Sequence, residues 1–255
     1  DNGQSNTSNV FYSEYQVQQR GDVWGMDGLV LTAGAVQQLT RGTAELYNGG
    51  NPEGINTATN RSAYLQIDQK AGERLNLSAG TRYEHFSIND STAAKPVFRA
   101  GLNFQAAEAS WFRASVGQGF RFPTIAEKFI RTGLGPLQVY PNNELRPETA
   151  INIEAGFKQG LRVGGFQGFL DVAGFYQEYD NFIEFTFGQW GNPLTDPLAG
   201  NGFRSLNTGS SRVTGWEASL MGRATWGETT LDVLAGYTYT NPVSLTPDYL
   251  YSVIT

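Results

Sequence analysis

Side chains able to perform catalytic chemistry are few in this chain. It holds one histidine, His85, and no cysteine, so sites built from several His or Cys ligands, and Ser-His-Asp or Cys-His arrangements, have no support. Four carboxylates lie near the ends of expected strands: Glu144, Glu148, Asp180 and Glu184. Paired carboxylates serve glycosidases, but solvated loop charges are the favoured interpretation. We therefore expect no enzyme, no catalytic residue, no metal site and no cofactor.

Residues suited to ligand binding gather instead in two long segments that lack strand periodicity. The six candidates are Arg121, Arg131 and Tyr140 in segment 121–147, and Phe187, Trp190 and Arg204 in segment 186–208. Arginine beside aromatic rings suits anionic or aromatic ligands such as ferric catecholates. Aromatic rings would equally suit a glycan. The alternative is that these side chains are ordinary loop-surface residues without a ligand.

The composition restricts the class of protein that must position these residues. Of the 255 residues, 16% are charged and 13% aromatic, and 31 are glycine; the mean hydropathy is −0.35. A net charge of −6 argues against nucleic acid as a partner. No run of 18 apolar residues occurs, which excludes a membrane-spanning helix, whereas a barrel strand needs only about 9–11 residues. A soluble β-sandwich and a transmembrane β-barrel remain.

Hydrophobic alternation with a period of two dominates the chain. In segment 74–88 the apolar side carries Leu75, Leu77, Ala79, Thr81, Tyr83 and His85, while polar residues and glycine occupy the other side. The pattern predicts about ten strands, many of them longer than the usual 5–6 residues. They lie near 10–19, 23–38, 62–70, 74–88, 96–105, 109–120, 148–160, 166–185, 209–226 and 230–240.

The connections between these strands alternate in length. Short turns are expected near 21–22, 71–73, 106–108, 162–165 and 227–228, and longer segments at 40–61, 89–95, 121–147 and 186–208. Outer-membrane barrels have short periplasmic turns and long extracellular loops, with aromatic girdles at both interfaces. Aromatic residues cluster at the expected strand ends: Phe11, Tyr12, Tyr15, Trp111, Phe112, Phe120, Phe122, Trp226, Tyr237 and Tyr239. Both features favour the barrel over the sandwich.

One long segment also contains a helix signal. Thr124 is followed three residues later by Glu127, which is the pattern of a capping box. We expect a short helical turn over 124–130.

An ordered series of motifs resembles the late barrel of the TonB-dependent receptors. The series comprises QGFRFPTIAEKF at 118–129, PNNELRPE at 141–148, NIEAGFK at 152–158, DVAGFYQEYDNFI at 171–183 and NTGSSRVTGWEASL at 207–220. Together the motifs cover about 100–120 residues in the family's order. Residues 1–110 resemble the family only in their general strand pattern.

The resemblance implies a fold and a function. The fold would be an all-β, antiparallel up-and-down meander of about ten long strands, part of a transmembrane barrel of about 22 strands. Residues 1–255 would form part of one barrel domain, with the plug domain and the final strands outside this chain. The function would be TonB-energised import of a scarce nutrient, foremost a ferric siderophore, otherwise haem, cobalamin or an oligosaccharide. Iron transport across the bacterial cell outer membrane is thus the leading hypothesis.

The implied partners follow from the same resemblance. They are outer-membrane lipid, the TonB complex acting through the missing N-terminal part, and a small-molecule or metal-chelate ligand or an oligosaccharide; no nucleic acid is expected. The alternatives are a passive porin or adhesin-type outer-membrane barrel and a soluble carbohydrate-binding β-sandwich.

Overall fold

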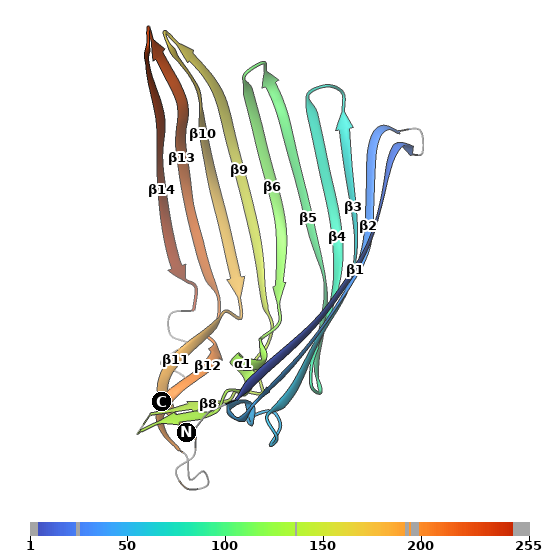
Figure 1. Ribbon diagram of the computed structural model, residues 1–255, viewed down its shortest axis with the longest axis vertical. Helices are drawn as coiled ribbons and strands as arrows, with labels where there is room; N and C mark the ends of the chain where they lie inside the picture. The colour runs from blue at the N-terminus through green and yellow to red at the C-terminus, as the bar shows by residue number, and fades with distance from the viewer. Residues whose placement is uncertain (1–4, 24–25, 136, 192–193, 195–198, 247–255) are drawn as a thin grey trace.

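The computed structural model describes residues 5–23, 26–135, 137–191, 194 and 199–246. Ten long strands pair with their neighbours in one antiparallel sheet (Figure 1). In order across the sheet these strands are β1 (Asn6–Val23), β2 (Met26–Ala44), β3 (Ile55–Ala71), β4 (Leu75–Ile88), β5 (Ser91–Ala107), β6 (Ser110–Arg121), β9 (Glu148–Val163), β10 (Phe166–Asp180), β13 (Ser211–Trp226) and β14 (Thr229–Ser244). The predicted all-β meander is confirmed. The sandwich alternative is wrong, because these strands form one continuous sheet rather than two packed sheets.

Four shorter strands form a second sheet at one end of the first. Its order is β11 (Ile183–Trp190), β12 (Gly200–Asn207), β8 (Leu137–Tyr140) and β7 (Thr132–Leu134). The described residues also include the helix α1 (Ile125–Phe129) and the 3-10 turn η1 (Glu45–Tyr47). No helix within the described ranges is long and apolar enough to span a membrane.

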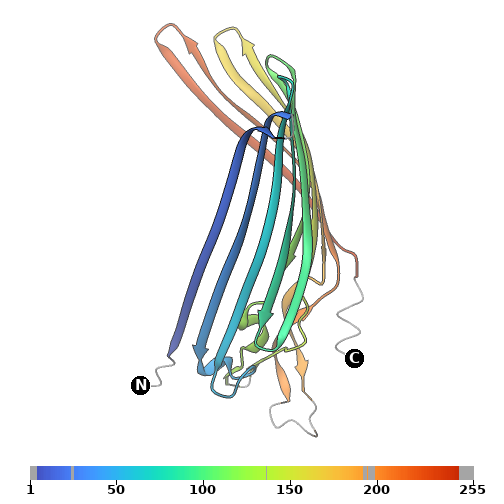
Figure 2. The ribbon, with the colours of Figure 1, turned by 90° about the vertical axis from the view of Figure 1, so that its right-hand side faces the viewer.

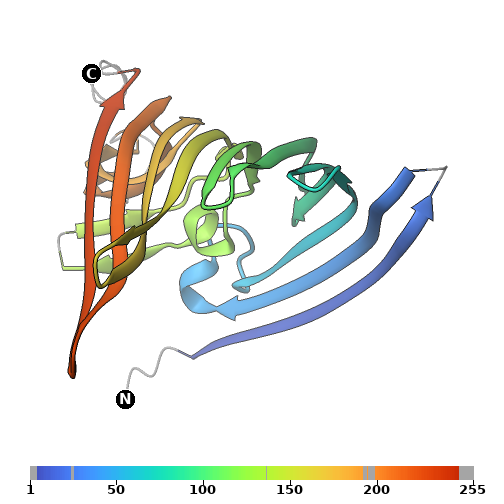
Figure 3. The ribbon, with the colours of Figure 1, turned by 90° about the horizontal axis from the view of Figure 1, so that it is seen from above.

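The large sheet is curved (Figures 2 and 3). Its two sides differ chemically. Helix α1 lies on the concave side, which we call the inward side (Figure 3). A Cβ added to Gly42 would lie 3.5 Å from Ile125 of α1, so even-numbered residues of β2 face inward. The strand registers carry this assignment across the sheet.

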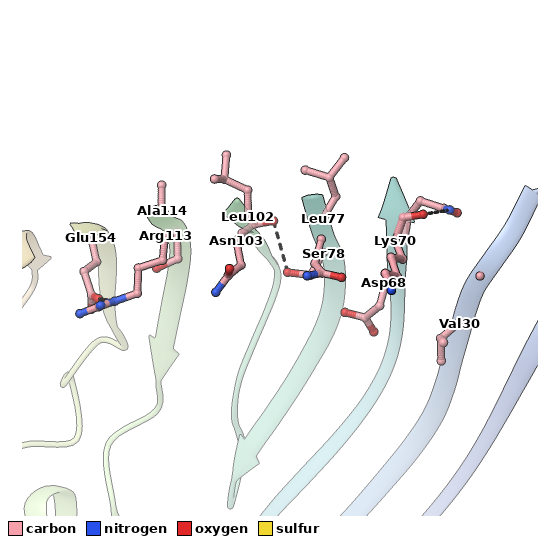
Figure 4. A pocket seen from close by; sticks show the side chains of 15 residues that line it. Val30, Asp68, Lys70, Leu77, Ser78, Leu102, Asn103, Arg113, Ala114 and Glu154 are labelled. Carbon is pink, nitrogen blue, oxygen red and sulfur yellow. Dashed lines mark hydrogen bonds and ion pairs between the residues drawn. The ribbon is translucent and has the colours of Figure 1, made fainter. Parts of the chain in front are cut away.

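Apolar side chains occupy the outward side and remain exposed. Leu65, Leu77 and Leu102 are each 41% exposed, and Tyr237 is 59% exposed. Figure 4 shows Leu77, Leu102 and Ala114 on one side of the sheet and Asp68, Asn103, Arg113 and Glu154 on the other. A continuous apolar face of this extent is unfavourable in water but suits lipid.

The inward side carries charges of both signs that pair across strands. The Arg113 Nη1 lies 2.5 Å from an Asp171 carboxylate oxygen, and its Nε lies 3.1 Å from Glu154. The three residues come from β6, β10 and β9, so the ion pairs connect three neighbouring strands.

The two ends of the sheet differ in their connections (Figure 1). At the turn end, β3 joins β4, β9 joins β10 and β13 joins β14 through turns with glycine in the left-handed region: Gly72 at φ 67°, Gly164 at φ 57° and Gly227 at φ 59°. At the opposite, loop end lie η1, α1 and the small sheet. The predicted alternation of connection lengths is confirmed with one exception.

The exception is the predicted loop 89–95, which was wrong. β4 ends at Ile88 and β5 begins at Ser91, with Asn89 at φ 47° in a tight turn. Residues 91–98 of β5, which include Pro96, pair only with β4. Proline is tolerated there because its missing N–H has no neighbouring strand to meet.

Two further predictions need correction. The predicted strand 166–185 is divided near Asn181, at φ 55°, into β10 and the beginning of β11. The aromatic girdle is also incomplete, since the Tyr12 hydroxyl donates inward to Glu14 at 2.6 Å and Phe122 packs in a cluster beside α1. Residues 24–25, next to the predicted turn at 21–22, lie outside the described residues, as do 192–193 and 195–198 of the predicted long segment 186–208.

Candidate functional site

Three connections meet at the loop end of the sheet, and we call their described residues the loop cap: 45–54, 122–135, 137–147, 181–191, 194 and 199–210. Backbone hydrogen bonds join them. The Arg131 N–H donates to Leu46 O at 2.7 Å, and the Gly49 N–H donates to Phe129 O at 3.2 Å. The Asn142 side chain donates to Ser205 O at 2.8 Å and joins the third connection, so the cap is one connected structure.

Helix α1 forms where the capping-box pattern predicted it. The Glu127 N–H donates to Thr124 Oγ1 at 3.2 Å, and the Thr124 N–H donates to Glu127 Oε2 at 2.7 Å. Ile125 and Phe129 then pack with Ile88 and Phe122 in the buried cluster under the cap. The predicted helical turn is confirmed, and it fixes the cap to the inward side of the sheet.

Lys128 is buried in the cap without a carboxylate partner. Its Nζ donates to Asn143 O at 2.8 Å and to Leu145 O at 3.4 Å, and it lies 5.9 Å from the Phe122 ring centre. Burial lowers the pKa of the Lys128 ammonium. Lys128 thus joins α1 to the segment that leads into β9, which is a structural role.

Glu148 connects the cap to the wall. One carboxylate oxygen accepts from Arg121 Nε, and the other accepts from the Ile183 N–H at 2.6 Å. Arg121 also donates from Nη1 to both oxygens of Glu127 at 3.0 Å. A single carboxylate thereby fixes the end of β6, the start of β9 and the start of β11, while Glu127 connects the same arginine to α1.

One side of the small sheet brings together three of the predicted binding residues. Strands β8 and β12 are parallel and place Tyr140 opposite Arg204. The Arg204 guanidinium lies 5.8 Å from the Trp190 ring centre, and the Trp190 Nε1–H donates to Gly202 O at 3.0 Å. Arg204 Nη2 donates to Asn142 Oδ1 at 3.4 Å.

Among the described residues no carboxylate forms an ion pair with the Arg204 guanidinium, although the charge of Glu144 acts on it. Burial lowers the pKa of Arg204, and its buried Nε has no hydrogen-bond partner among the described residues. A guanidinium held against an indole, with an unused donor, is chemically suited to an anionic or aromatic ligand.

The other side of the same hairpin carries three phenylalanines. Phe185 and Phe203 stack with ring centres 5.1 Å apart, and Phe187 meets Phe203 edge to face at 5.2 Å. Phe185 is 56% and Phe187 51% exposed. The three rings form an exposed aromatic surface that water does not favour.

A groove of about 390 Å³ lies between the cap and the inward side of the wall. Its lining residues include polar side chains from β1 to β3, such as Ser8, Gln38 and Asn60, and the rings of Tyr47 and Phe86. The groove offers hydrogen-bond donors and acceptors beside aromatic rings.

The structure thus places the six predicted binding residues at four locations. Tyr140, Trp190 and Arg204 meet on one side of the small sheet, and Phe187 lies on the other. Arg121 is engaged with Glu127 and Glu148 at the rim of the wall. Arg131 is exposed and lies beside η1 through its backbone.

Sequence reasoning missed the partners of these residues. Phe185, Phe203 and Asn142 were not singled out, although Phe185 and Phe187 alternate as in a strand. Among the described residues, no three His, Cys, Asp or Glu side chains lie close enough together to hold a metal ion.

A curved antiparallel meander with an exposed apolar outer side and a polar inner side is the wall of a transmembrane β-barrel, and here it carries a folded cap. The chain belongs to the family of TonB-dependent receptors: the family described as "TonB dependent receptor-like, beta-barrel" matches residues 1–253.

Solved structures of similar fold include a double mutant of the hemophore receptor HasR of Serratia marcescens, in complex with its hemophore HasA and heme. It is 18% identical with a TM-score of 0.75, over 94% of this chain and 42% of that chain. The siderophore receptor PirA of Pseudomonas aeruginosa is 15% identical with a TM-score of 0.72, over 94% of this chain and 44% of that chain.

A mutant of the ferric enterobactin receptor PfeA, also from Pseudomonas aeruginosa, is 15% identical with a TM-score of 0.70, over 92% of this chain and 36% of that chain. The chain therefore spans less than half the length of these receptors. No curated protein sequence matches the chain.

Proposed function

We propose that this chain supplies wall and extracellular loops to an outer-membrane receptor that imports a scarce nutrient with energy from TonB. The observation that carries the proposal is the family match over residues 1–253. The apolar outward side supports a position in the outer membrane, with the loop cap outside the cell and the turn end toward the periplasm. The alternative of a passive porin or adhesin-type barrel finds no specific support in the geometry.

The ligand class we propose is an anionic, aromatic metal chelate, foremost a ferric siderophore. Arg204 held against Trp190 provides a cation beside an aromatic plane, and Tyr140 lies on the same side of the small sheet. The siderophore and heme named for the similar structures agree with this chemistry, although identities of 14–18% extend only to the fold. An oligosaccharide would use the aromatic rings without the guanidinium.

The remaining parts of the receptor would lie outside this chain. A plug domain and the TonB-contacting segment would precede the wall described here, and further strands would close the barrel, because open sheet edges are not tolerated in lipid. Residues 1–255 would then be one section of a barrel domain.

Uptake by cells carrying the full-length receptor tests the proposal. The probes are radiolabelled ferric enterobactin, ferrichrome, heme, cobalamin and maltohexaose, each offered to cells with and without TonB. Uptake of one probe that requires both the receptor and TonB is the expected result. Receptor-dependent uptake that persists without TonB would instead identify a passive channel.

Two variants test the binding surface. Arg204→Gln removes the guanidinium, and we expect roughly a tenfold increase in Kd for the imported probe if it is an anionic chelate. Arg162→Gln is the matched control, because Arg162 is an exposed arginine at the turn end of β9. Equal affinities for both variants and the wild type would exclude Arg204 from ligand recognition.

A further inference from the structure

Charged side chains on the outward side of β1–β5 gather in the loop half of the wall, apart from Asp27 at the turn end of β2. From Leu29 of β2 to the loop end, the described outward positions of these strands lack Asp, Glu and Lys, and their ionisable residues apart from tyrosine are Arg41, Arg61 and His85. The inward side of the same strands carries charges of both signs, including Glu14, Asp68, Arg82, Glu84 and Lys95. The loop half of this outward side is therefore basic, without an acidic residue among its described positions.

Strand register places the three residues on neighbouring strands, and we call them the basic patch. Arg61 lies opposite Gln37 on β2 and opposite His85 on β4. Arg41 lies four residues beyond Gln37, which is roughly 13 Å further toward the loop end. All three residues are exposed, and neither arginine forms an ion pair among the described residues.

A tyrosine row borders the basic patch on its turn-end side. Tyr15 and Tyr83 flank Ala35 and Ala63 in one register row, two residues from the row of Arg61. Tyr15 is 73% and Tyr83 52% exposed. Beyond them follow the apolar residues of the outward side: Leu65, Ile67, Leu77, Ala79, Ala100 and Leu102.

Along the wall, from the turn end toward the loop end, the outward side thus presents apolar residues, then tyrosines, then unpaired cations. This order matches the layers of one membrane leaflet. Hydrocarbon meets the apolar band, the interface suits amphipathic tyrosine, and an anionic headgroup region attracts arginine. Arginine is the side chain that best matches phosphate, since it presents several donors in a planar fork.

We infer that the basic patch binds the phosphate groups of an anionic lipid in the leaflet on the loop side. The inference rests on the proposed position of the wall in a membrane. Closing the barrel would cover the strand edges and the inward side, whereas the outward side of β2–β4 would still face lipid. The basic patch has no carboxylate to pair with, and a phosphorylated headgroup supplies the negative charge.

Binding of diphosphoryl lipid A to the full-length receptor in detergent micelles tests the inference. The double variant R41Q/R61Q is compared with K95Q/R162Q, which removes two cations from the inward side. Each arginine near a membrane surface contributes about a fivefold factor, so we expect roughly 25-fold weaker binding for R41Q/R61Q and wild-type binding for the control. Heat-modifiable gel mobility checks that both variants are folded.

Three other outcomes would each overturn the inference. Equal lipid A binding by both double variants would show that the patch takes no headgroup. Displacement of lipid A by inorganic phosphate at equal concentration would show a general anion site. A change in oligomeric state of R41Q/R61Q without loss of lipid A binding would assign the surface to a second copy. Insertion of the wild-type receptor into vesicles and TonB-dependent uptake are measured separately, so failure of the proposed function is distinguishable from failure of the patch.

Discussion

Replacing Glu148 by alanine is expected to release β11 from the wall while leaving the barrel intact. Glu148 accepts from Arg121 with one carboxylate oxygen and from the Ile183 N–H, at 2.6 Å, with the other. The small sheet, which holds Trp190 and Arg204, begins at this contact.

The magnitude follows from the two lost interactions. The Arg121 side chain is 43% exposed and that of Glu148 is 11% exposed, so the ion pair contributes about 0.5–1 kcal/mol. Loss of the charged acceptor of the Ile183 N–H costs about 1–2 kcal/mol more. Glu148→Ala should therefore lower the local opening free energy by about 2–3 kcal/mol. Glu148→Gln keeps an oxygen for the Ile183 N–H and should cost only about 1 kcal/mol.

Hydrogen exchange measured by mass spectrometry on the full-length receptor in micelles reports this opening. Peptides covering 183–190 should exchange roughly 30- to 150-fold faster in the alanine variant. Peptides from β13 and β14 should be unchanged, because global unfolding is not involved. Glu184→Ala is the matched control, since Glu184 is an exposed carboxylate one residue further along β11 with no ion pair among the described residues.

Two results would refute the reasoning. Wild-type exchange of 183–190 in Glu148→Ala would mean that other contacts hold the small sheet. Equal acceleration in the alanine and glutamine variants would mean that charge alone, and not the acceptor for Ile183, connects the cap to the wall.

Three further predictions concern the loop cap. Thr124→Ala removes the capping box and should destabilise α1 by about 1 kcal/mol, seen as faster exchange of 125–129, whereas Thr124→Ser should behave as wild type. Burial lowers the pKa of the Lys128 ammonium below its value in the unfolded chain, so unfolding takes up a proton at high pH. The free energy of unfolding measured in urea should therefore rise as the pH rises toward 10.5. Lys128→Met should lack this rise, and a rise of equal size in that variant would refute the assignment. Trp190→Phe removes the donor to Gly202 and should cost about 1 kcal/mol in exchange of 200–203, with Phe187→Leu on the opposite side as the control.

The strands of the wall were predictable because each side of the sheet imposes its own chemistry on alternate residues. Leu75, Leu77 and Ala79 face outward, while Ser78 lies in the polar hollow of the inward side. The capping box of α1 was predictable for a similar reason, since Thr124 and Glu127 satisfy each other's backbone within one turn. Both signals are local, and the surroundings reinforce them.

The small sheet was not predictable in the same way. Strands β8 and β12 pair through Gly202 and Gln138, which are far apart in the sequence, and both strands are short and partly built of small residues. Their pairing depends on where the wall positions the two connections that contain them, one between β6 and β9 and one between β10 and β13. The same holds for Asn207, which donates to both Arg146 O and Asn181 O and so joins two loops.

The sequence by itself determined the ten long strands of the wall, its two chemically different sides and the family, because period-two patterning and motif order are local to the chain. Only the tertiary structure decided which loop residues meet. It joined Arg121 to Glu127 and Glu148, placed Arg204 against Trp190, and put Arg41, Arg61 and His85 on one outward surface. The physical reason is register: which residues become neighbours across strands depends on hydrogen-bond pairing between distant segments, and that pairing leaves no periodic signal in either segment alone.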